Sequence, residues 1–271
     1  MHTPLGYGTL ALYAGSLVFY LWLLYGDKRQ IGTLATLCLA GGLVVHYLAL
    51  LERSRMVHAV PYEDLYGSMS LFAWLLAFTY LALETYHRER SVGAFVMPFV
   101  ILWMVFAMAI APGLAPRPAP ARGVVFALHV TLNILAYSAF ALSFVLSLIY
   151  LLQNRVLRGR NPGRVFWRFP ALDLLEQITR SSVLIGLVSL VCGIVMGLIW
   201  AHRLSGHYWS ADPKIIVTFA VLGAYGVYLW LARLATWRGA RAAILCVCNF
   251  AIVIFSYTFV NLYLTSFHRY F

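Results

Sequence analysis

The sequence predicts an all-α, polytopic membrane protein with about eight transmembrane helices and both termini outside the cytoplasm. Of its 271 residues, 62% are hydrophobic and only 11% are charged. The mean hydropathy of +0.82 lies far above that of soluble domains. Apolar runs recur along the chain at about 20 residues each, the length that one helix needs to cross a bilayer. We expect residues 1–271 to form a single transmembrane domain.

Eight apolar runs reach this length, and each is expected to be a helix, because a helix satisfies its own backbone polar groups within lipid. The first run follows no basic segment and has no small-residue cleavage site, so we expect it to be retained. Several runs carry Tyr or Trp near their ends, as is typical of the headgroup zone. The runs cover approximately residues 5–26, 32–51, 67–85, 92–111, 124–152, 182–204, 214–236 and 242–264.

Basic residues predict the orientation, because Lys and Arg in short loops are retained on the cytoplasmic side. They are most frequent in the loops after the first, third, fifth and seventh runs, so we expect these loops to face the cytoplasm. The longest of them, 153–181, contains residues 170–178, which we expect to form a short amphipathic helix on the inner membrane surface. The net charge of +11 thus reflects topology, and no folded basic face is left for nucleic acid.

With this topology most histidines lie on the side away from the cytoplasm. Imidazole is a common metal ligand, and two imidazoles from separate helices can hold a haem iron along its axis. His129, in the first outer turns of its helix, and His268, just beyond the last helix, are the preferred pair. Alternatively, an interfacial histidine only hydrogen-bonds headgroups or water, and spacing leaves both interpretations open. The outer histidines are His2, His46, His58, His129, His202, His207 and His268, whereas His87 is on the inside.

The segment between the sixth and seventh runs is a second candidate feature. Its candidate cofactor-binding residues are Trp200, His207, Tyr208, Trp209 and Asp212. Flat aromatic rings can stack on a porphyrin, which favours a binding site. The alternative is an ordinary aromatic belt, and in both cases Asp212 is well placed to cap the next helix.

Two ionisable residues within the apolar runs need separate consideration. His46 is a candidate cofactor-binding residue, because an imidazole in lipid is a functional hypothesis by default. Packing between helices by a hydrogen-bonded neutral histidine explains it equally well. Glu84 is the only acidic residue within the runs, close to the inner end of the third. An ion-coupled transporter needs such groups near the bilayer midplane, so this class ranks lowest.

Four segments carry a family resemblance. Residues 205–215 keep seven positions of the pattern Trp-Gly-x-Tyr-Trp-Ser-Trp-Asp-Pro-Lys-Glu. Residues 237–243 are similar to the turn Trp-Arg-Gly-x-Arg-Ala-Ala, and 260–268 to the ending Val-Asn-x-x-Leu-x-x-x-His. Residues 61–68 are similar to Pro-x-x-Asn-x-Tyr-Glu-Ser. These patterns resemble the CcsA/ResC type of cytochrome c assembly protein, within a haem-handling group marked by a tryptophan-rich outer loop.

The resemblance implies a role in cytochrome c biogenesis. His129 and His268 stand where the family has its outer haem-ligating histidines, so the chain is expected to bind haem b at the extracytoplasmic face and present it for covalent attachment to apocytochrome c. It would then be a component of a holocytochrome c synthetase (haem lyase). The implied partners are a CcsB/ResB-type membrane protein, thiol-reducing proteins and the lipid bilayer. The implied location is the bacterial inner membrane.

The sequence also departs from the family pattern. Ser205 and Ala211 replace two tryptophans of the loop, and Ile215 replaces its glutamate. Trp230 stands in the seventh run, where many members carry a histidine thought to ligate haem within the membrane. These departures favour the alternative, a haem-binding regulatory or assembly-factor membrane protein without ligation activity.

Overall fold

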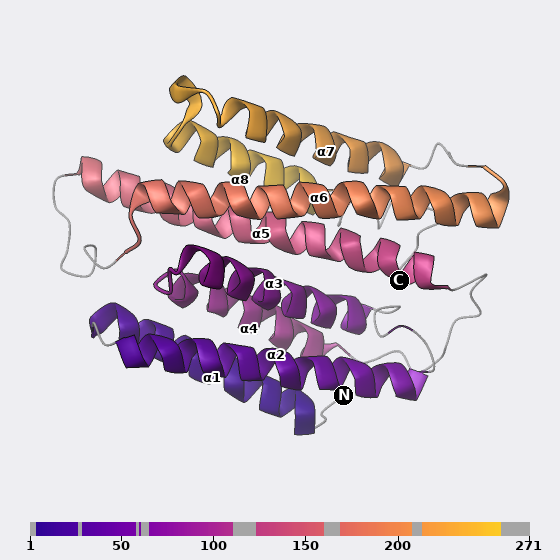
Figure 1. The fold of residues 1–271 in the computed structure, drawn as a ribbon, viewed down its shortest axis with the longest axis horizontal. Helices are drawn as coiled ribbons and strands as arrows, with labels where there is room; N and C mark the ends of the chain where they lie inside the picture. Colours follow the sequence, from indigo (N-terminus) through magenta and orange to yellow (C-terminus); the bar gives the residue numbers. More distant parts are fainter. Residues whose placement is uncertain are drawn as a thin grey trace.

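The computed structural model consists of helices that run side by side along the long axis of the molecule (Figure 1). It describes residues 4–26, 29–57, 60, 65–110, 123–159, 169–207 and 213–255. These ranges contain α-helices and one short 3-10 helix but no strand, so the predicted all-α class is confirmed. The elements are α1 (Pro4–Tyr25), α2 (Arg29–Val57), α3 (Leu65–His87), α4 (Gly93–Ala109), α5 (Val124–Arg158), α6 (Leu172–Ser205), α7 (Pro213–Leu231), η2 (Ala235–Trp237) and α8 (Ala240–Phe255).

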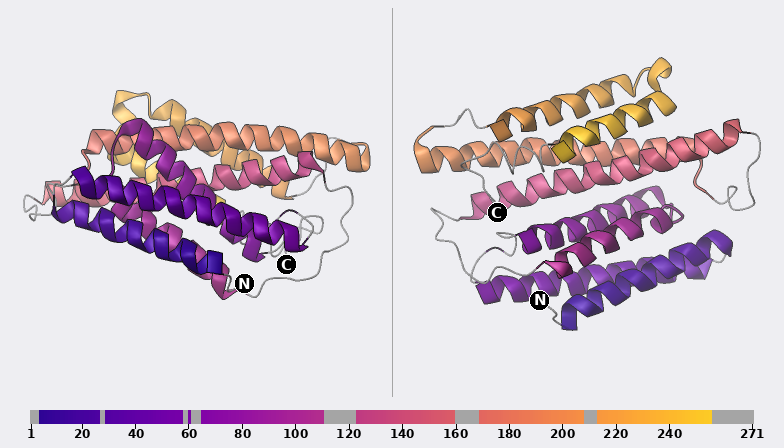
Figure 2. Two further views of the ribbon diagram at one scale, coloured as in Figure 1. Left: turned by 60° about the horizontal axis from the view of Figure 1, so that its bottom comes forward. Right: turned by 180° about the vertical axis from the view of Figure 1, so that it is seen from behind.

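The bundle has two halves that meet mainly where α3 packs against α5. Helices α1 to α4 pack on one another in the first half, and α5 to α8 in the second (Figures 1 and 2). One buried apolar cluster fills the first half and includes residues of α5 and of the start of α6. A second cluster joins α5, α6, α7 and α8.

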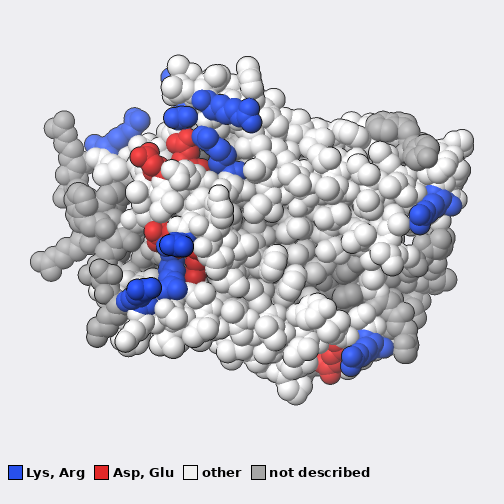
Figure 3. All heavy atoms as spheres, viewed as in Figure 1, with Lys and Arg blue, Asp and Glu red and all other residues white. Residues whose placement is uncertain are grey.

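Within the described ranges, five helices are long and apolar enough to cross a membrane, namely α1, α2, α3, α5 and α6. Helices α4, α7 and α8 are apolar but shorter there. Charged side chains gather towards the two ends of the molecule and leave an uncharged band between them (Figure 3). Large apolar side chains are exposed on the helices, such as Leu37 at 61% exposure. The chain is therefore a multi-pass membrane protein, while the number of crossings and the side of the termini remain predictions.

Successive helices run in opposite directions, so the polar residues at the helix ends fall into two groups, one at each end of the bundle. We call one end the arginine-rich end; its described basic residues are Arg29, Arg88, Arg90, Arg155, Arg158, Arg180, Arg233, Arg238 and Arg241. We call the other the histidine end, where His129, His202 and His207 lie. Its described basic residues are Arg53, Arg55 and Arg203. The division is the one expected from the positive-inside rule.

The prediction for residues 170–178 is wrong in one respect. This segment is not a separate surface helix, because Leu172–Ser205 forms one continuous helix. Leu175 and Ile178 are buried in the core of the first half. Hydropathy detects only the apolar stretch, whereas the polar first turns of α6 continue the helix and carry an i,i+4 pair between Glu176 and Arg180. For the same reason α2 and α5 extend beyond the predicted runs.

The turn between α7 and α8 explains one of the sequence motifs. Helix α7 ends at Leu231, and the turn η2 follows before α8 begins at Ala240. Gly239 has a φ of +78°, and a β-carbon there would come within 2.8 Å of the Tyr150 hydroxyl. Glycine is the residue that fits both conditions. The glycine of the Trp-Arg-Gly turn is therefore required by the backbone and by its contact with α5.

Candidate functional site

Half of the predicted site residues lie within the described ranges. His129 is in the second turn of α5 and Trp200 in the last two turns of α6, so both are at the histidine end. His207 is exposed just beyond α6, and His46 is buried in α2. The remaining candidates, Tyr208, Trp209, Asp212 and His268, lie outside the described residues.

His129 has a defined hydrogen-bonding environment. Its Nδ1 lies 2.7 Å from the backbone carbonyl oxygen of Gly193 in α6. A carbonyl oxygen can only accept, so this contact is a hydrogen bond in the tautomer that carries its hydrogen on Nδ1. The lone pair of the neutral ring is then on Nε2. An imidazole that donates through one nitrogen and ligates through the other is the usual arrangement of a metal-bound histidine.

Two glycines of α6 make room for this contact. A β-carbon on Gly197 would lie 2.6 Å from both Nδ1 and Cε1 of His129. A β-carbon on Gly193 would lie 2.8 Å from the side-chain nitrogen of Asn133, one turn after His129. Real β-carbons do not approach other atoms this closely. The glycine pair therefore lets α5 place His129 and Asn133 directly on the backbone of α6.

Aromatic rings border the same site. The ring planes of His129 and Trp200 are 13° apart, and their centroids are separated by 6.4 Å. Phe126, one turn before His129, also packs against the indole of Trp200, with ring centroids 4.9 Å apart. Phe126 also belongs to the apolar cluster that joins α5 to the ends of α2 and α3. The imidazole thus has a flat apolar border, suited to a flat conjugated ligand.

His46 is placed quite differently. It is fully buried, its Nδ1 lies 3.2 Å from the Tyr13 hydroxyl, and its Nε2 lies 2.9 Å from Oγ of Ser70. One ring nitrogen donates and the other accepts, and both hydroxyls can take either role. The ring therefore connects α1, α2 and α3. Of the two interpretations left open by the sequence, this geometry favours helix packing.

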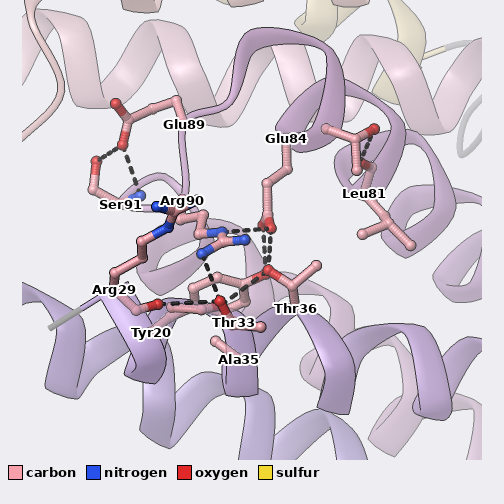
Figure 4. A network of polar contacts seen from close by, with 12 residues as sticks. Tyr20, Arg29, Thr33, Ala35, Thr36, Leu81, Glu84, Glu89, Arg90 and Ser91 are labelled. Carbon is pink, nitrogen blue, oxygen red and sulfur yellow. Dashed lines mark hydrogen bonds and ion pairs between the residues drawn. The ribbon is translucent and has the colours of Figure 1, made fainter.

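Glu84 forms a polar network at the arginine-rich end (Figure 4). Its buried carboxylate accepts hydrogen bonds from the hydroxyls of Tyr20 in α1 and Thr36 in α2. Arg90, in the turn after α3, approaches with Nε 3.8 Å from Oε1 and donates through Nη1 to Thr33 at 3.1 Å. The carboxylate therefore links α1, α2 and α3 with the turn that carries Arg90.

Asn133, Gly193 and Gly197 were not among the residues predicted from the sequence. The signal for the glycines was present, because Gly193 and Gly197 form the G-x-x-x-G spacing of closely packed membrane helices. Asn133 follows His129 by four residues, which places both on one helix face. The sequence does not show which helix packs against that face, because this depends on the tertiary structure. Among the described residues no group of three or more His, Cys, Asp or Glu could hold a metal ion.

The fold and the site together define a multi-pass helical membrane protein with a backbone-anchored histidine at one end. A family model described as "Cytochrome C assembly protein" matches residues 62–268, so the chain belongs to that family, and the resemblance stated from the sequence is confirmed.

Several relatives match over most of their length. Protein HemX of Bacillus subtilis (strain 168) is 28% identical over 264 residues, which cover 96% of this chain and 95% of that protein. Protein HemX of Brevibacillus brevis is 28% identical over 229 residues, 82% of each chain. Cytochrome c biogenesis protein CcsA of Prochlorococcus marinus (strain MIT 9215) is 26% identical over 246 residues, 82% of this chain and 80% of that protein.

A solved structure shares the fold. The cytochrome c heme lyase CcmF superposes with a TM-score of 0.64 at 17% identity, covering 98% of this chain. The chain spans 45% of that protein's length. At this identity the likeness shows a common helical architecture and carries no residue roles.

Proposed function

We propose that the chain binds haem b at the extracytoplasmic face through His129 and His268 and presents it for covalent attachment to apocytochrome c. The observation that carries the proposal is the 2.7 Å contact between His129 Nδ1 and the carbonyl oxygen of Gly193, which favours the tautomer whose lone pair is on Nε2. Membership of the cytochrome c assembly family supports it.

The described half of the site fits a haem. His129 offers the correct nitrogen and is held by backbone, and Trp200 and Phe126 supply an apolar border. Arg203, exposed in the last turn of α6, is a cation within the same end that suits a propionate. Bound haem would supply the vinyl groups that react with cysteine thiols, while this chain binds and orients it.

Charge supports the orientation in this proposal. The arginine-rich end would face the cytoplasm and the histidine end the outside, as the positive-inside rule requires in a bacterial inner membrane. Reporter fusions test this. A phosphatase active only outside the cytoplasm should be inactive when inserted within 160–168 and active within 111–122. The reverse pattern would place the proposed site on the cytoplasmic side and overturn it.

Haem binding is tested with the full-length protein purified from a haem-replete host. We expect a Soret band with the sharp visible bands of six-coordinate haem, and its loss in His129→Ala and His268→Ala. His202→Ala, which removes a histidine at the same end, is the matched control and should keep the spectrum. Added imidazole should restore the bands in the two ligand variants. A colourless protein that also fails to take up added haem would refute the proposal.

A second candidate function is a haem-binding regulatory or assembly-factor protein without attachment activity. Ser205 and Ala211 favour it, because the tryptophan platform of the loop is reduced. The HemX relatives also carry a name that refers to no step of cytochrome c assembly. Deleting the gene distinguishes the two candidate functions. Loss of covalently bound haem from the cell's c-type cytochromes supports attachment, and unchanged cytochromes support the second candidate.

The partners of the first proposal are a CcsB/ResB-type membrane protein, apocytochrome c and thiol-reducing proteins. Haem attachment needs reduced cysteines, and the described cysteines of this chain are free thiols inside the helices, of which Cys246 is fully buried. Reducing power for the apocytochrome would therefore come from another protein. Copurification with a membrane partner in mild detergent tests this part.

A further inference from the structure

Two groups compete for one nitrogen of His129. Nδ1 lies 2.7 Å from the carbonyl oxygen of Gly193 and 3.2 Å from the amide nitrogen of Asn133. The first group can only accept a hydrogen bond, and the second can only donate one. Nδ1 therefore bonds to Gly193 when it carries the hydrogen, and to Asn133 when the hydrogen is on Nε2. The two tautomers of one ring have different partners.

The orientation of the Asn133 amide is well determined. Its nitrogen donates to the backbone carbonyl of His129 at 2.7 Å, a contact that its oxygen could not make. The nitrogen has two hydrogens. One is used on the carbonyl, and the other is available at the side of the imidazole. Gly193, which has no side chain, lets this amide lie flat on α6.

We propose that Asn133 is a positioning residue that limits how strongly His129 holds haem, by stabilising the tautomer that cannot ligate. This inference rests on the proposed function. With the hydrogen on Nε2, Asn133 gains a hydrogen bond and the ring has no lone pair for iron. With the hydrogen on Nδ1, two donors face each other across 3.2 Å, and the amide dipole draws electron density from the ring. Both effects oppose ligation.

Such a device suits a protein that must pass haem on. A ligand that is fully committed to one tautomer would hold the iron more tightly and release it more slowly. The hydrogen bond to Gly193 stabilises the tautomer that can ligate iron. The hydrogen bond from Asn133 stabilises the other tautomer and so keeps the free-energy difference between the two small. The pair makes the site one for transient binding.

The first test is made without haem. Imidazole nitrogen chemical shifts in ¹⁵N-histidine protein report the tautomer, and His129→Gln assigns the signals of His129. We expect a mixture of the two tautomers in the wild type and a shift towards hydrogen on Nδ1 in Asn133→Ala. A ring already wholly in the Nδ1 form in the wild type, unchanged by the substitution, would overturn the proposal.

The second test uses haem-loaded protein. We expect Asn133→Ala to slow haem transfer to apomyoglobin by about threefold and to favour ferric over ferrous haem by the same factor. For a one-electron couple, a threefold preference for ferric over ferrous haem lowers the midpoint potential by about 28 mV. Asn133→Leu, closer to asparagine in volume, should act in the same direction. If Asn133 only supported the fold, both variants would lose haem faster, and this result would contradict the proposal.

A matched control is available in α8. Asn249 also donates its amide to a backbone carbonyl, that of Ala224 at 2.9 Å, in the half-bundle of α5 to α8. Asn249→Ala should leave the haem potential unchanged. The two proposals fail separately: a wild type without haem refutes the proposed function, whereas a wild type with haem and an unmoved potential in Asn133→Ala refutes only the role of Asn133.

Discussion

His129 of α5 lies directly on the backbone of α6 at Gly197, so that a β-carbon there would stand 2.6 Å from two atoms of the imidazole. No side chain separates the ring from the helix. The position of His129, the proposed ligand, therefore depends on Gly197 having no β-carbon.

Gly197→Ala should therefore displace the imidazole. Supporting groups of a metal ligand typically change affinity by about 10- to 100-fold, and we expect a loss of haem affinity in this range. Haem titration followed at the Soret band measures it. Gly223→Ala is the control, because a β-carbon at that helical position would meet nothing within 4 Å. Equal affinities of both variants would contradict the site.

His46→Phe tests the packing role of the buried imidazole. The change removes the hydrogen-bond partner of the Tyr13 and Ser70 hydroxyls, so each is left as a buried polar group that has lost a hydrogen bond. Such groups cost about 1–3 kcal/mol. We expect a lower unfolding temperature in detergent and an unchanged Soret band. A variant as stable as the wild type that has lost its haem would instead make His46 a ligand.

Glu84→Leu tests the network at the arginine-rich end. It removes the acceptor of the Tyr20 hydroxyl, whereas the Thr36 hydroxyl can still donate to the carbonyl oxygen of Gly32. We expect a loss of about 1–3 kcal/mol in the free energy of unfolding for the buried Tyr20 hydroxyl. Arg90→Gln should cost about 1 kcal/mol or less, because the Arg90 side chain is 35% exposed and its charge is screened. Denaturant titration of both variants measures the difference. A larger loss for Arg90→Gln would be inconsistent with this account.

Gly239→Ala should destabilise the turn between α7 and α8. The left-handed φ of +78° costs an alanine about 1–2 kcal/mol, and its methyl group would meet the Tyr150 hydroxyl. Thermal unfolding provides the measurement. Gly226→Ala, at an open helical position in α7, should be neutral or stabilising. If both variants unfold at the wild-type temperature, the glycine of this turn has no structural role.

Sequence reasoning succeeded where a single helix carries the signal. Apolar length identified every α-helix of the described ranges, and arginine placement separated the two ends. It failed for residues 170–178 by separating a surface helix from the sixth run, because polar residues such as Glu176 end the apolar run although the helix α6 is continuous. It also left His46 undecided, since the partners of that imidazole are 33 and 24 positions away.

The sequence by itself determined the helical membrane class, the division of charge between the two ends and the family, because these depend on composition and on short local patterns. It also singled out His129. Only the tertiary structure decided that Gly193, Gly197 and Asn133 surround this imidazole, and that His46 is bonded on both sides. Contacts between helices depend on which faces meet, and the spacing within one helix does not contain that information.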